Sequence, residues 1–168
     1  MTRGPWQHNQ QVDCLVIGGG PAGLTAALYL ARFRLSVQVI DRGAGRAASI
    51  PLTRNYPGFP EGIAGRGLVR RIGEQAVRYG ARIATGDVAT VERLDGAFPF
   101  RCRTGNGLIE ASAVILATGI QDVRPPIDER LHDAALAAGL FRYCPICEGL
   151  EVTGQRVSVI GRGACVFR

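Results

Sequence analysis

The 168-residue chain contains no lysine: all 20 of its basic residues are arginine, and its formal net charge is +6. A basic balance raises nucleic acid or a membrane surface as possible partners. The arginines are scattered, however, and no basic tract with interleaved aromatics or other nucleic-acid-binding signature is present. We therefore expect no nucleic-acid partner and interpret the charges as a solvated surface.

Long hydrophobic runs are also lacking. The uncharged stretch Cys14–Ala31 reaches about the minimum of ~18 residues for a transmembrane segment, but Gly18-Gly19-Gly20-Pro21 interrupts it. Residues 1–11 are polar and lack the apolar core of a secretory signal. We expect no membrane partner and a cytoplasmic protein, in which most of the five cysteines stay reduced.

Glycine is abundant, with 23 residues, but no Gly-X-Y period accompanies it, which excludes a collagen-like chain. The glycines must instead serve turns and close backbone approaches. Hydrophobic residues at 46% and charged residues at 20% exclude wholesale disorder and are typical of a globular protein.

The order of apolar runs predicts an α/β fold with a parallel sheet and a small β-meander at 98–112. A strand, a glycine turn, a helix and a second strand follow one another within about 30 residues, as in a βαβ unit. The predicted strands are 12–17, 35–40, 81–94, 98–104, 113–119 and 155–160, and the predicted helices are 24–34 and 67–79. The irregular segment 42–67 is long enough to be functional, and residues 121–129 are the best linker candidate.

The motif Gly18-x-Gly20-x-x-Gly23 lies between a predicted strand and a predicted helix, the context that makes it a dinucleotide-binding signature. Gly18 permits the tight turn, Gly20 lets the backbone approach a pyrophosphate, and Gly23 lets the helix pack on the strand. The helix N-terminus favours the anion. Asp41 ends the next strand and would accept hydrogen bonds from a ribose hydroxyl. The turn alone leaves open whether the dinucleotide is FAD or a nicotinamide cofactor.

Cys144-Pro145-Ile146-Cys147 is a C-x-x-C motif whose spacing allows a reversible disulfide at the first turn of a helix. Pro145 suits the first helical position, and a cysteine at a helix start gains thiolate character. Zinc is the competing interpretation, but it needs a second ligand pair, whereas Cys165 and His132 each stand alone. Cys14 and Cys102 lie in predicted strands and are expected to be small core residues.

Four motifs together resemble those of bacterial-type thioredoxin reductases and their flavoprotein relatives. They are Gly-Gly-Gly-Pro-Ala-Gly at 18–23, Asn-Tyr-Pro-Gly at 55–58, Ala-Thr-Gly at 117–119 and Cys-Pro-Ile-Cys-Glu-Gly at 144–149. The resemblance implies a Rossmann-like FAD-binding domain at 1–126, lacking a returning C-terminal segment, and the start of an NADPH-binding domain at 127–168. It also implies a homodimer for the full-length protein.

The same resemblance assigns roles to individual residues. Cys144 and Cys147 would be the redox-active pair, and Glu148 the proton donor, at a position where aspartate is usual. The implied FAD contacts are Gly18, Gly20, Pro21, Ala22, Gly23, Asp41, Arg42, Asn55, Val88, Thr118 and Gly119, and the implied NADPH contacts are Gly161 and Gly163. The chain departs from the family at residues 45–50, which do not read Gly-Gly-Gln-Leu, and at Val166, where a small residue is usual.

Three functions remain open at this stage. The first is an oxidoreductase that passes electrons from NADPH through FAD to Cys144–Cys147 and on to thioredoxin or a similar disulfide. The second is an FAD-dependent dithiol oxidase with oxygen as acceptor. The third is an inactive truncated fragment. We expect the cysteine pair to form, but the NADPH-to-disulfide reaction to be weak or missing in a chain with so little of the second domain.

Overall fold

The structure is a computed structural model that describes residues 10–43 and 45–161. Within them, a six-stranded sheet has the order β3-β2-β1-β6-β5-β4. Its strands are β1 (Gln10–Ile17), β2 (Val37–Asp41), β3 (Arg82–Thr85), β4 (Val88–Arg93), β5 (Phe100–Thr104) and β6 (Gly107–Leu116). β1 pairs in parallel with both β2 and β6, and β2 with β3, whereas β5 pairs antiparallel with β6 and β4. The predicted parallel sheet and meander are confirmed.

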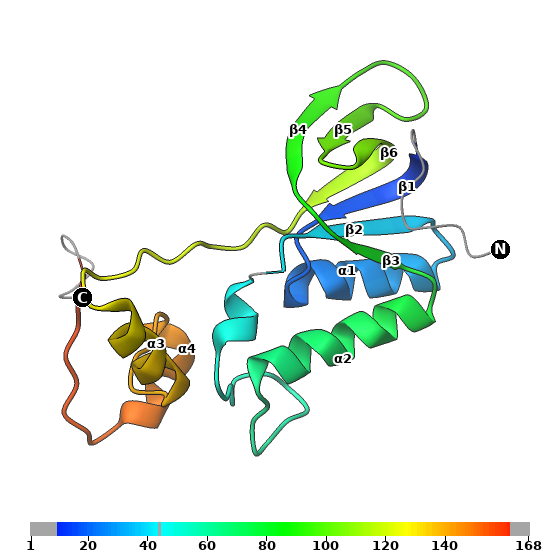
Figure 1. The fold of residues 1–168 in the computed structure, drawn as a ribbon. Helices are drawn as coiled ribbons and strands as arrows, with labels where there is room; N and C mark the ends of the chain where they lie inside the picture. Colours follow the sequence, from blue (N-terminus) through cyan, green and yellow to red (C-terminus); the bar gives the residue numbers. More distant parts are fainter. Residues whose placement is uncertain (1–9, 44, 162–168) are drawn as a thin grey trace.

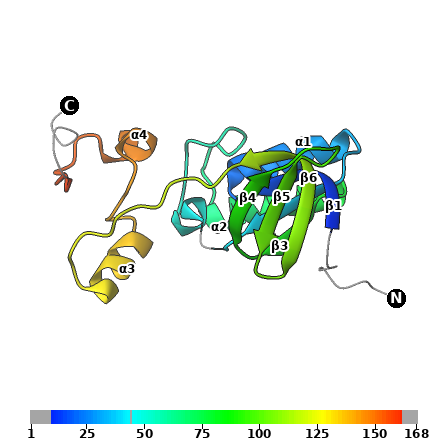
Figure 2. The same ribbon diagram turned by 90° about the horizontal axis from the view of Figure 1, so that it is seen from above.

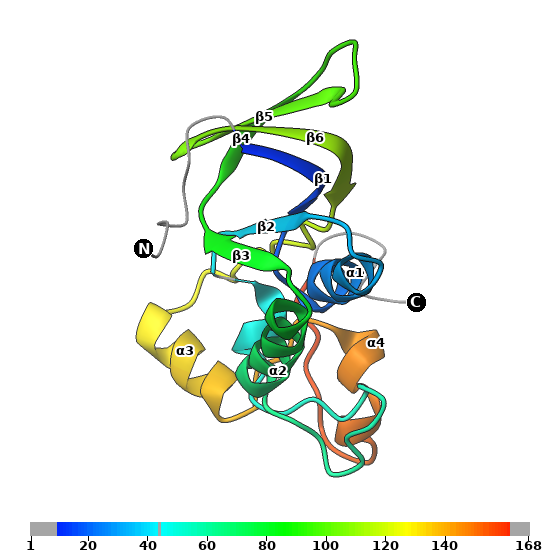
Figure 3. The same cartoon turned by 90° about the vertical axis from the view of Figure 1, so that its right-hand side faces the viewer.

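The helices and 3-10 turns lie either between β1 and β3 or after β6. They are α1 (Pro21–Arg32), the 3-10 turn η1 (Arg46–Ser49), α2 (Gly65–Arg78), α3 (Glu129–Ala137), α4 (Pro145–Glu148) and the 3-10 turn η2 (Leu150–Val152). α1 and α2 lie side by side on the same face of the sheet (Figures 1 and 3). α1 begins three residues earlier than predicted because Pro21 is a good first helical residue.

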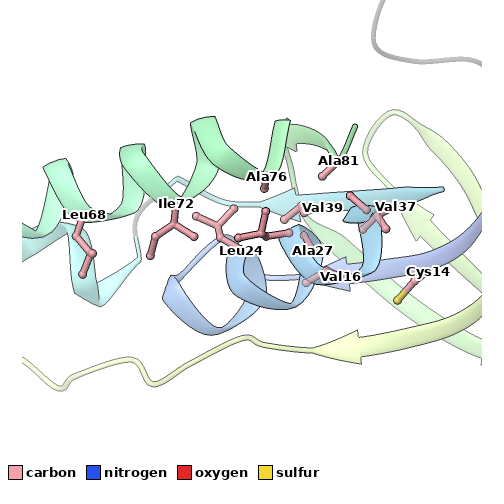
Figure 4. Packing of buried hydrophobic residues seen from close by; sticks show 12 residues of the cluster. Cys14, Val16, Leu24, Ala27, Val37, Val39, Leu68, Ile72, Ala76 and Ala81 are labelled. Carbon is pink, nitrogen blue, oxygen red and sulfur yellow. The ribbon is translucent and has the colours of Figure 1, made fainter. Parts of the chain in front are cut away.

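The apolar spacing of α1 and α2 explains why they pack there. Leu24, Ala27, Leu28 and Ala31 are buried along one stripe of α1, and Leu68, Ile72 and Ala76 along one stripe of α2. Figure 4 shows Leu24 and Ala27 of α1 and Leu68, Ile72 and Ala76 of α2 beside Val16 of β1 and Val39 of β2. The carboxyl ends of the parallel strands therefore lie next to the N-terminus of α1.

The other face of the sheet carries its own core. Leu15 and Ile40 alternate with the residues that face the helices and pack instead with Cys102, Ile109 and Ala111 of the meander. Burial on both faces explains why β1 and β2 read as continuous apolar runs. The meander thus covers the face that the helices leave open.

Residues 81–94 are not the single strand that the sequence predicts. Gly86 and Asp87 separate two strands, because β3 pairs in parallel with β2 while β4 turns to pair antiparallel with β5. The Gly86 N–H donates to the Asp41 carbonyl at 2.9 Å and ends the parallel ladder. Propensity alone does not report this change of partner.

The predicted strand at 155–160 is wrong: these residues have no regular secondary structure. A strand needs a neighbour to satisfy its backbone groups, and the segment lies on no sheet edge. Val157, Val159 and Ile160 are 56%, 64% and 68% exposed.

Residues 118–126 connect the sheet to a separate group of short helices, which we call the α3–α4 segment (residues 127–152). Figures 1 and 2 show this connection as an extended stretch, with α3 and α4 lying to one side of the sheet. Asp128 caps α3 by accepting the Leu131 N–H at 3.0 Å. No helix in the described ranges is long and apolar enough to span a bilayer.

Candidate functional site

The glycine turn between β1 and α1 depends on the absence of side chains at Gly18, Gly19 and Gly23; a Cβ on Gly19 would lie 2.7 Å from Asp41 Cβ. Gly18 has φ +109°, and a Cβ there would overlap the carbonyl of Ala117 at the end of β6. A Cβ on Gly23 would overlap the Gly18 carbonyl oxygen and approach Val16 Cγ1 at 3.1 Å. These glycines therefore serve the close packing of turn, helix and sheet.

Gly20 differs from Gly18 and Gly23, because a Cβ on Gly20 would meet nothing within 4 Å. Gly20 is the N-cap of α1 and Pro21 its first residue, and Ala22 is exposed beside them. The amides of a first helical turn have no partner within the helix and favour an anion. The residues present thus fit a pyrophosphate laid against the open side of Gly20.

Asp41, at the end of β2, organises this turn as well as facing it. Its Oδ1 accepts the Gly19 N–H at 2.8 Å, and its Oδ2 accepts the Gly43 N–H at 3.0 Å. A carboxylate has about four acceptor positions, so lone pairs remain for ribose hydroxyls. The structural role of Asp41 is one that the motif did not reveal.

Arg42, Val88, Thr118 and Gly119 are also assigned to the flavin, and they differ in exposure and in their partners. Arg42 forms a bidentate ion pair with Asp87, with both N···O distances at 3.0 Å, and both side chains are exposed. Val88 is half-buried at the start of β4. Thr118 and Gly119 lie just beyond β6, after Ala117, and are exposed.

The cysteine pair lies at the start of α4, as the sequence predicts. Cys144 is the N-cap, Pro145 follows it, and Cys144 and Cys147 form a disulfide with Cα atoms 5.2 Å apart. The Cys147 N–H donates to Cys144 Sγ at 3.1 Å. α4 has only four residues, so this direct hydrogen bond, rather than a long helix dipole, would stabilise a thiolate at Cys144.

A cavity of about 170 Å³ separates the cysteine pair from the loop that follows β2. On one side it is lined by Arg46, Ala47 and Ser49 through Pro51, and on the other by Phe141 through Cys144, Cys147 and Glu148. Glu148 accepts a hydrogen bond from Arg142 Nη1 at 3.0 Å, and its side chain is only 12% exposed. The expected proton donor therefore lies on the same cavity as both cysteines.

One polar contact joins this helix group to the rest of the molecule, and a second holds the connection that leads to it. Asn55 Nδ2 donates to the Cys147 carbonyl at 3.1 Å, and the Thr53 hydroxyl donates to Asn55 Oδ1 at 2.7 Å. Thr53 is itself buried in a two-residue bridge with Ile63. Arg46 pairs with Asp122 in the connection at 2.9 Å. Asn55, predicted to lie beside a flavin, thus contacts the redox pair directly.

The loop that lines the cavity is docked on the N-terminus of α2. The Gly65 N–H donates to the Ile50 carbonyl at 2.9 Å, and a Cβ on Gly65 would overlap the Ala47 carbonyl oxygen. No motif in the sequence marks Gly65, Thr53, Arg46 or Arg142 as site residues. Their partners are distant in sequence or irregularly spaced, so no periodic signal marks them.

The remaining cysteines and glycines have more ordinary surroundings. Cys14 and Cys102 are buried in the sheet, as predicted, and desolvation raises the pKa of both thiols, that of Cys102 to about 11. Gly161 is exposed without a preceding strand, and Gly163 and Cys165 lie outside the described residues. Within the described ranges, no three His, Cys, Asp or Glu residues gather as metal ligands.

Comparison with known proteins agrees with this geometry. The chain is 36% identical over 155 residues to the thioredoxin reductase of Bacillus subtilis, covering 90% of this chain and 46% of that protein. It is 36% identical over 167 residues to the bifunctional thioredoxin reductase/thioredoxin of Mycobacterium leprae, covering 97% of this chain and 35% of that protein. The crystal structure of thioredoxin reductase from Streptococcus pyogenes superposes with a TM-score of 0.74 at 34% identity, covering 84% of this chain and 45% of that one.

The chain therefore spans less than half the length of each of these relatives. Its fold is that of the dinucleotide-binding part of such enzymes, with a mostly parallel sheet. The model of the family described as pyridine nucleotide-disulphide oxidoreductase matches residues 12–166. The glycine turn, the disulfide and this match over nearly the whole sequence agree, and the chain belongs to the pyridine nucleotide-disulphide oxidoreductase family.

Proposed function

We propose that this chain is the flavin-binding and disulfide-carrying portion of a thioredoxin reductase-like oxidoreductase. Electrons would pass from NADPH through FAD to Cys144–Cys147 and then to thioredoxin or a similar disulfide. The observation that carries the proposal is the cavity shared by the disulfide and the loop Arg46–Pro51. Residues 1–126 would belong to the flavin unit and residues 127–168 to the NADPH unit.

The glycine turn and Asp41 would hold the dinucleotide. Gly20 leaves room for the pyrophosphate, the first turn of α1 offers its amides, and Asp41 retains acceptors for ribose hydroxyls. When bound, FAD would supply a two-electron carrier between a nicotinamide and a disulfide. Asn55 would hold the backbone of Cys147 on the cavity side.

The disulfide is the group that accepts the electrons. Its S–S bond takes up two electrons and two protons to yield the thiols of Cys144 and Cys147. One of these, as a thiolate, attacks the partner's disulfide, and the other resolves the mixed disulfide, releasing the partner as a dithiol. Glu148 lies on the same cavity and would move a proton between a cysteine Sγ and solvent.

The test uses the 168-residue chain loaded with FAD under anaerobic conditions. NADPH is added, the reaction is quenched in acid, and free thiols are counted with a chromogenic disulfide in denaturant. Because so little of the NADPH unit is present, we expect only slow bleaching of the visible flavin absorbance by NADPH, ending with about two new thiols per chain. Cys147→Ser should abolish the new thiols, and Cys165→Ser, the matched control, should leave them unchanged.

Two results would contradict the proposal. One is a chain that retains no FAD at micromolar concentrations. The other is bleaching of the flavin by a small dithiol but not by NADPH, which would support a dithiol oxidase instead.

A further inference from the structure

Burial in the α3–α4 segment is concentrated on one polar side chain. Among the described residues 118–161, only His132 is buried, with 2% of its surface exposed. A polar group is buried at a cost unless its hydrogen bonds are satisfied. The local structure therefore centres on how His132 is bonded.

Both ring nitrogens of His132 have partners. Nδ1 lies 2.8 Å from Asp133 Oδ1, and Nε2 lies 2.7 Å from the hydroxyl of Tyr143. An ionised carboxylate only accepts hydrogen bonds, and the His132 bond holds the pKa of Asp133 below its ordinary value. Nδ1 therefore carries a proton, and in that tautomer Nε2 accepts from the Tyr143 hydroxyl.

Ring packing holds the same group together. The rings of His132, Phe141 and Tyr143 are 5.1 to 5.9 Å apart between centroids, and Phe141 meets Tyr143 edge-on. Arg142, between these two aromatic residues, is bonded to Glu148. Each residue of the stretch before Cys144 is thus fixed by its side chain.

Tyr143 is the residue that precedes the redox pair. The backbone of Cys144 is extended, with φ −122° and ψ 98°, and places Sγ where the Cys147 N–H reaches it. A freely rotating Tyr143 would release this N-cap geometry. A thiolate at Cys144 would then lose its backbone hydrogen bond.

We propose that His132 is a positioning residue for the redox pair, which fixes Tyr143 through the phenol hydrogen bond and so keeps Cys144 in its N-cap position in the reduced protein. Asp133 supports it by selecting the tautomer that accepts from Tyr143. The biological use of this arrangement rests on the proposed function, but the geometry itself requires no cofactor.

The test is the pH dependence of Cys144 alkylation in the reduced chain, without FAD or NADPH. Iodoacetamide labelling is followed by mass spectrometry of the Cys144 peptide. Tyr143→Phe keeps the ring and its packing but removes the hydroxyl, and His132→Phe removes both hydrogen bonds. We expect each variant to lower the labelling rate at pH 7 by about threefold to tenfold, through a higher thiol pKa.

Both variants remove the same hydrogen bond between His132 and Tyr143. The double variant should therefore label no more slowly than either single variant. Tyr29→Phe is the matched control, because Tyr29 is 58% exposed on α1, and its loss of a hydroxyl should change nothing. The charged groups around the cavity, Arg46, Arg142 and Glu148, are the same in all variants. Arg54 and Glu151, which line the adjoining opening beside Cys147, are also unchanged.

An unchanged labelling profile in Tyr143→Phe would overturn the inference, as would effects of the two single variants that multiply in the double variant. The assay also separates this inference from the proposed function. If the wild-type chain binds no flavin but the two variants label more slowly as expected, the positioning role is retained and the reductase function is rejected. If thiols form in a flavin-dependent reaction but the variants label at the wild-type rate, the reductase function is retained and the positioning role is rejected.

Discussion

The sheet-bearing part of the molecule (residues 10–117) and the α3–α4 segment are stabilised in different ways. Within residues 10–43 and 45–161, every buried hydrophobic side chain lies in the first part, in two clusters on opposite faces of the sheet. In the second, apolar side chains face solvent: Ile146 and Leu150 are 96% and 85% exposed. The redox pair therefore lies in the part of the described chain that has no apolar core of its own.

This difference shows what positions the disulfide. Apolar burial is non-directional and holds the sheet-bearing part together through many small contacts. The α3–α4 segment depends instead on a few directional contacts. Asn55 binds the Cys147 carbonyl from the sheet-bearing part, Arg46 binds Asp122 in the connection, and His132 binds Tyr143 within the segment. Each such contact contributes only about 1 kcal/mol, so the redox pair is held far less firmly than the glycine turn.

The largest expected difference between the two parts is in the effect of truncating an apolar side chain. Leu15 is completely buried, and Leu15→Ala should lower the free energy of unfolding by about 3–5 kcal/mol through lost burial and a cavity. Ile146→Ala, at an exposed position, should change it by less than about 0.5 kcal/mol. Urea unfolding followed by circular dichroism measures both. Similar losses for the two variants would mean that the α3–α4 segment has an apolar core.

The next largest effect is expected at the glycine turn, within the sheet-bearing part. Gly→Ala inside a helix is normally stabilising, but Gly23→Ala would press a methyl group against the Gly18 carbonyl and should cost about 2–3 kcal/mol. Gly20→Ala, the matched control, meets open space and should cost less than about 1 kcal/mol. It should nevertheless weaken FAD binding about tenfold, measured by quenching of flavin fluorescence. Normal FAD affinity in Gly20→Ala would remove the pyrophosphate from that side of the turn.

A smaller effect is expected from the contact that joins the two parts. Asn55→Ala removes the hydrogen bond to the Cys147 carbonyl, and amide hydrogen exchange in α4 should become about fivefold faster, equivalent to about 1 kcal/mol. Mass spectrometry of deuterated peptides measures this rate. Asn106→Ala, in the exposed hairpin between β5 and β6, is the control and should leave exchange in α4 unchanged. Equal rates in wild type and Asn55→Ala would show that other contacts hold the helix.

The smallest expected effect is on the pKa of Asp133 and on stability at low pH. The hydrogen bond from His132, with a further contribution from Arg124, keeps the pKa of Asp133 below its ordinary value of 3.8. Because the folded pKa is depressed, this stabilisation is present above the unfolded pKa and is lost as the pH falls through the folded pKa. A carboxyl NMR titration should find Asp133 below 3.8, and His132→Phe should raise it toward that value. No change in His132→Phe would separate Asp133 from the His132 group.

The sequence alone determined the βαβ unit, its glycine turn and the cysteine pair. The apolar runs at 12–17 and 37–40 predict parallel strands because both faces of each must be buried. Gly18, Gly20 and Gly23 predict the turn from the room that a close backbone approach needs. Cys144 and Cys147 form their disulfide through the local geometry of a helix start. In each case the deciding contacts are between near neighbours in the chain or follow a regular period.

Only the tertiary structure decided where these pieces lie relative to one another. It ended β3 at Thr85 because the next residues change partner, and it left 155–160 without a strand because no neighbour pairs with it. It also brought Asn55 to Cys147, Arg142 to Glu148 and His132 to Tyr143. These are directional polar contacts between side chains with no fixed spacing, and hydrophobic periodicity carries no information about them. The physical reason is that burial is read from composition and period, whereas a hydrogen bond exists only once both groups have been placed.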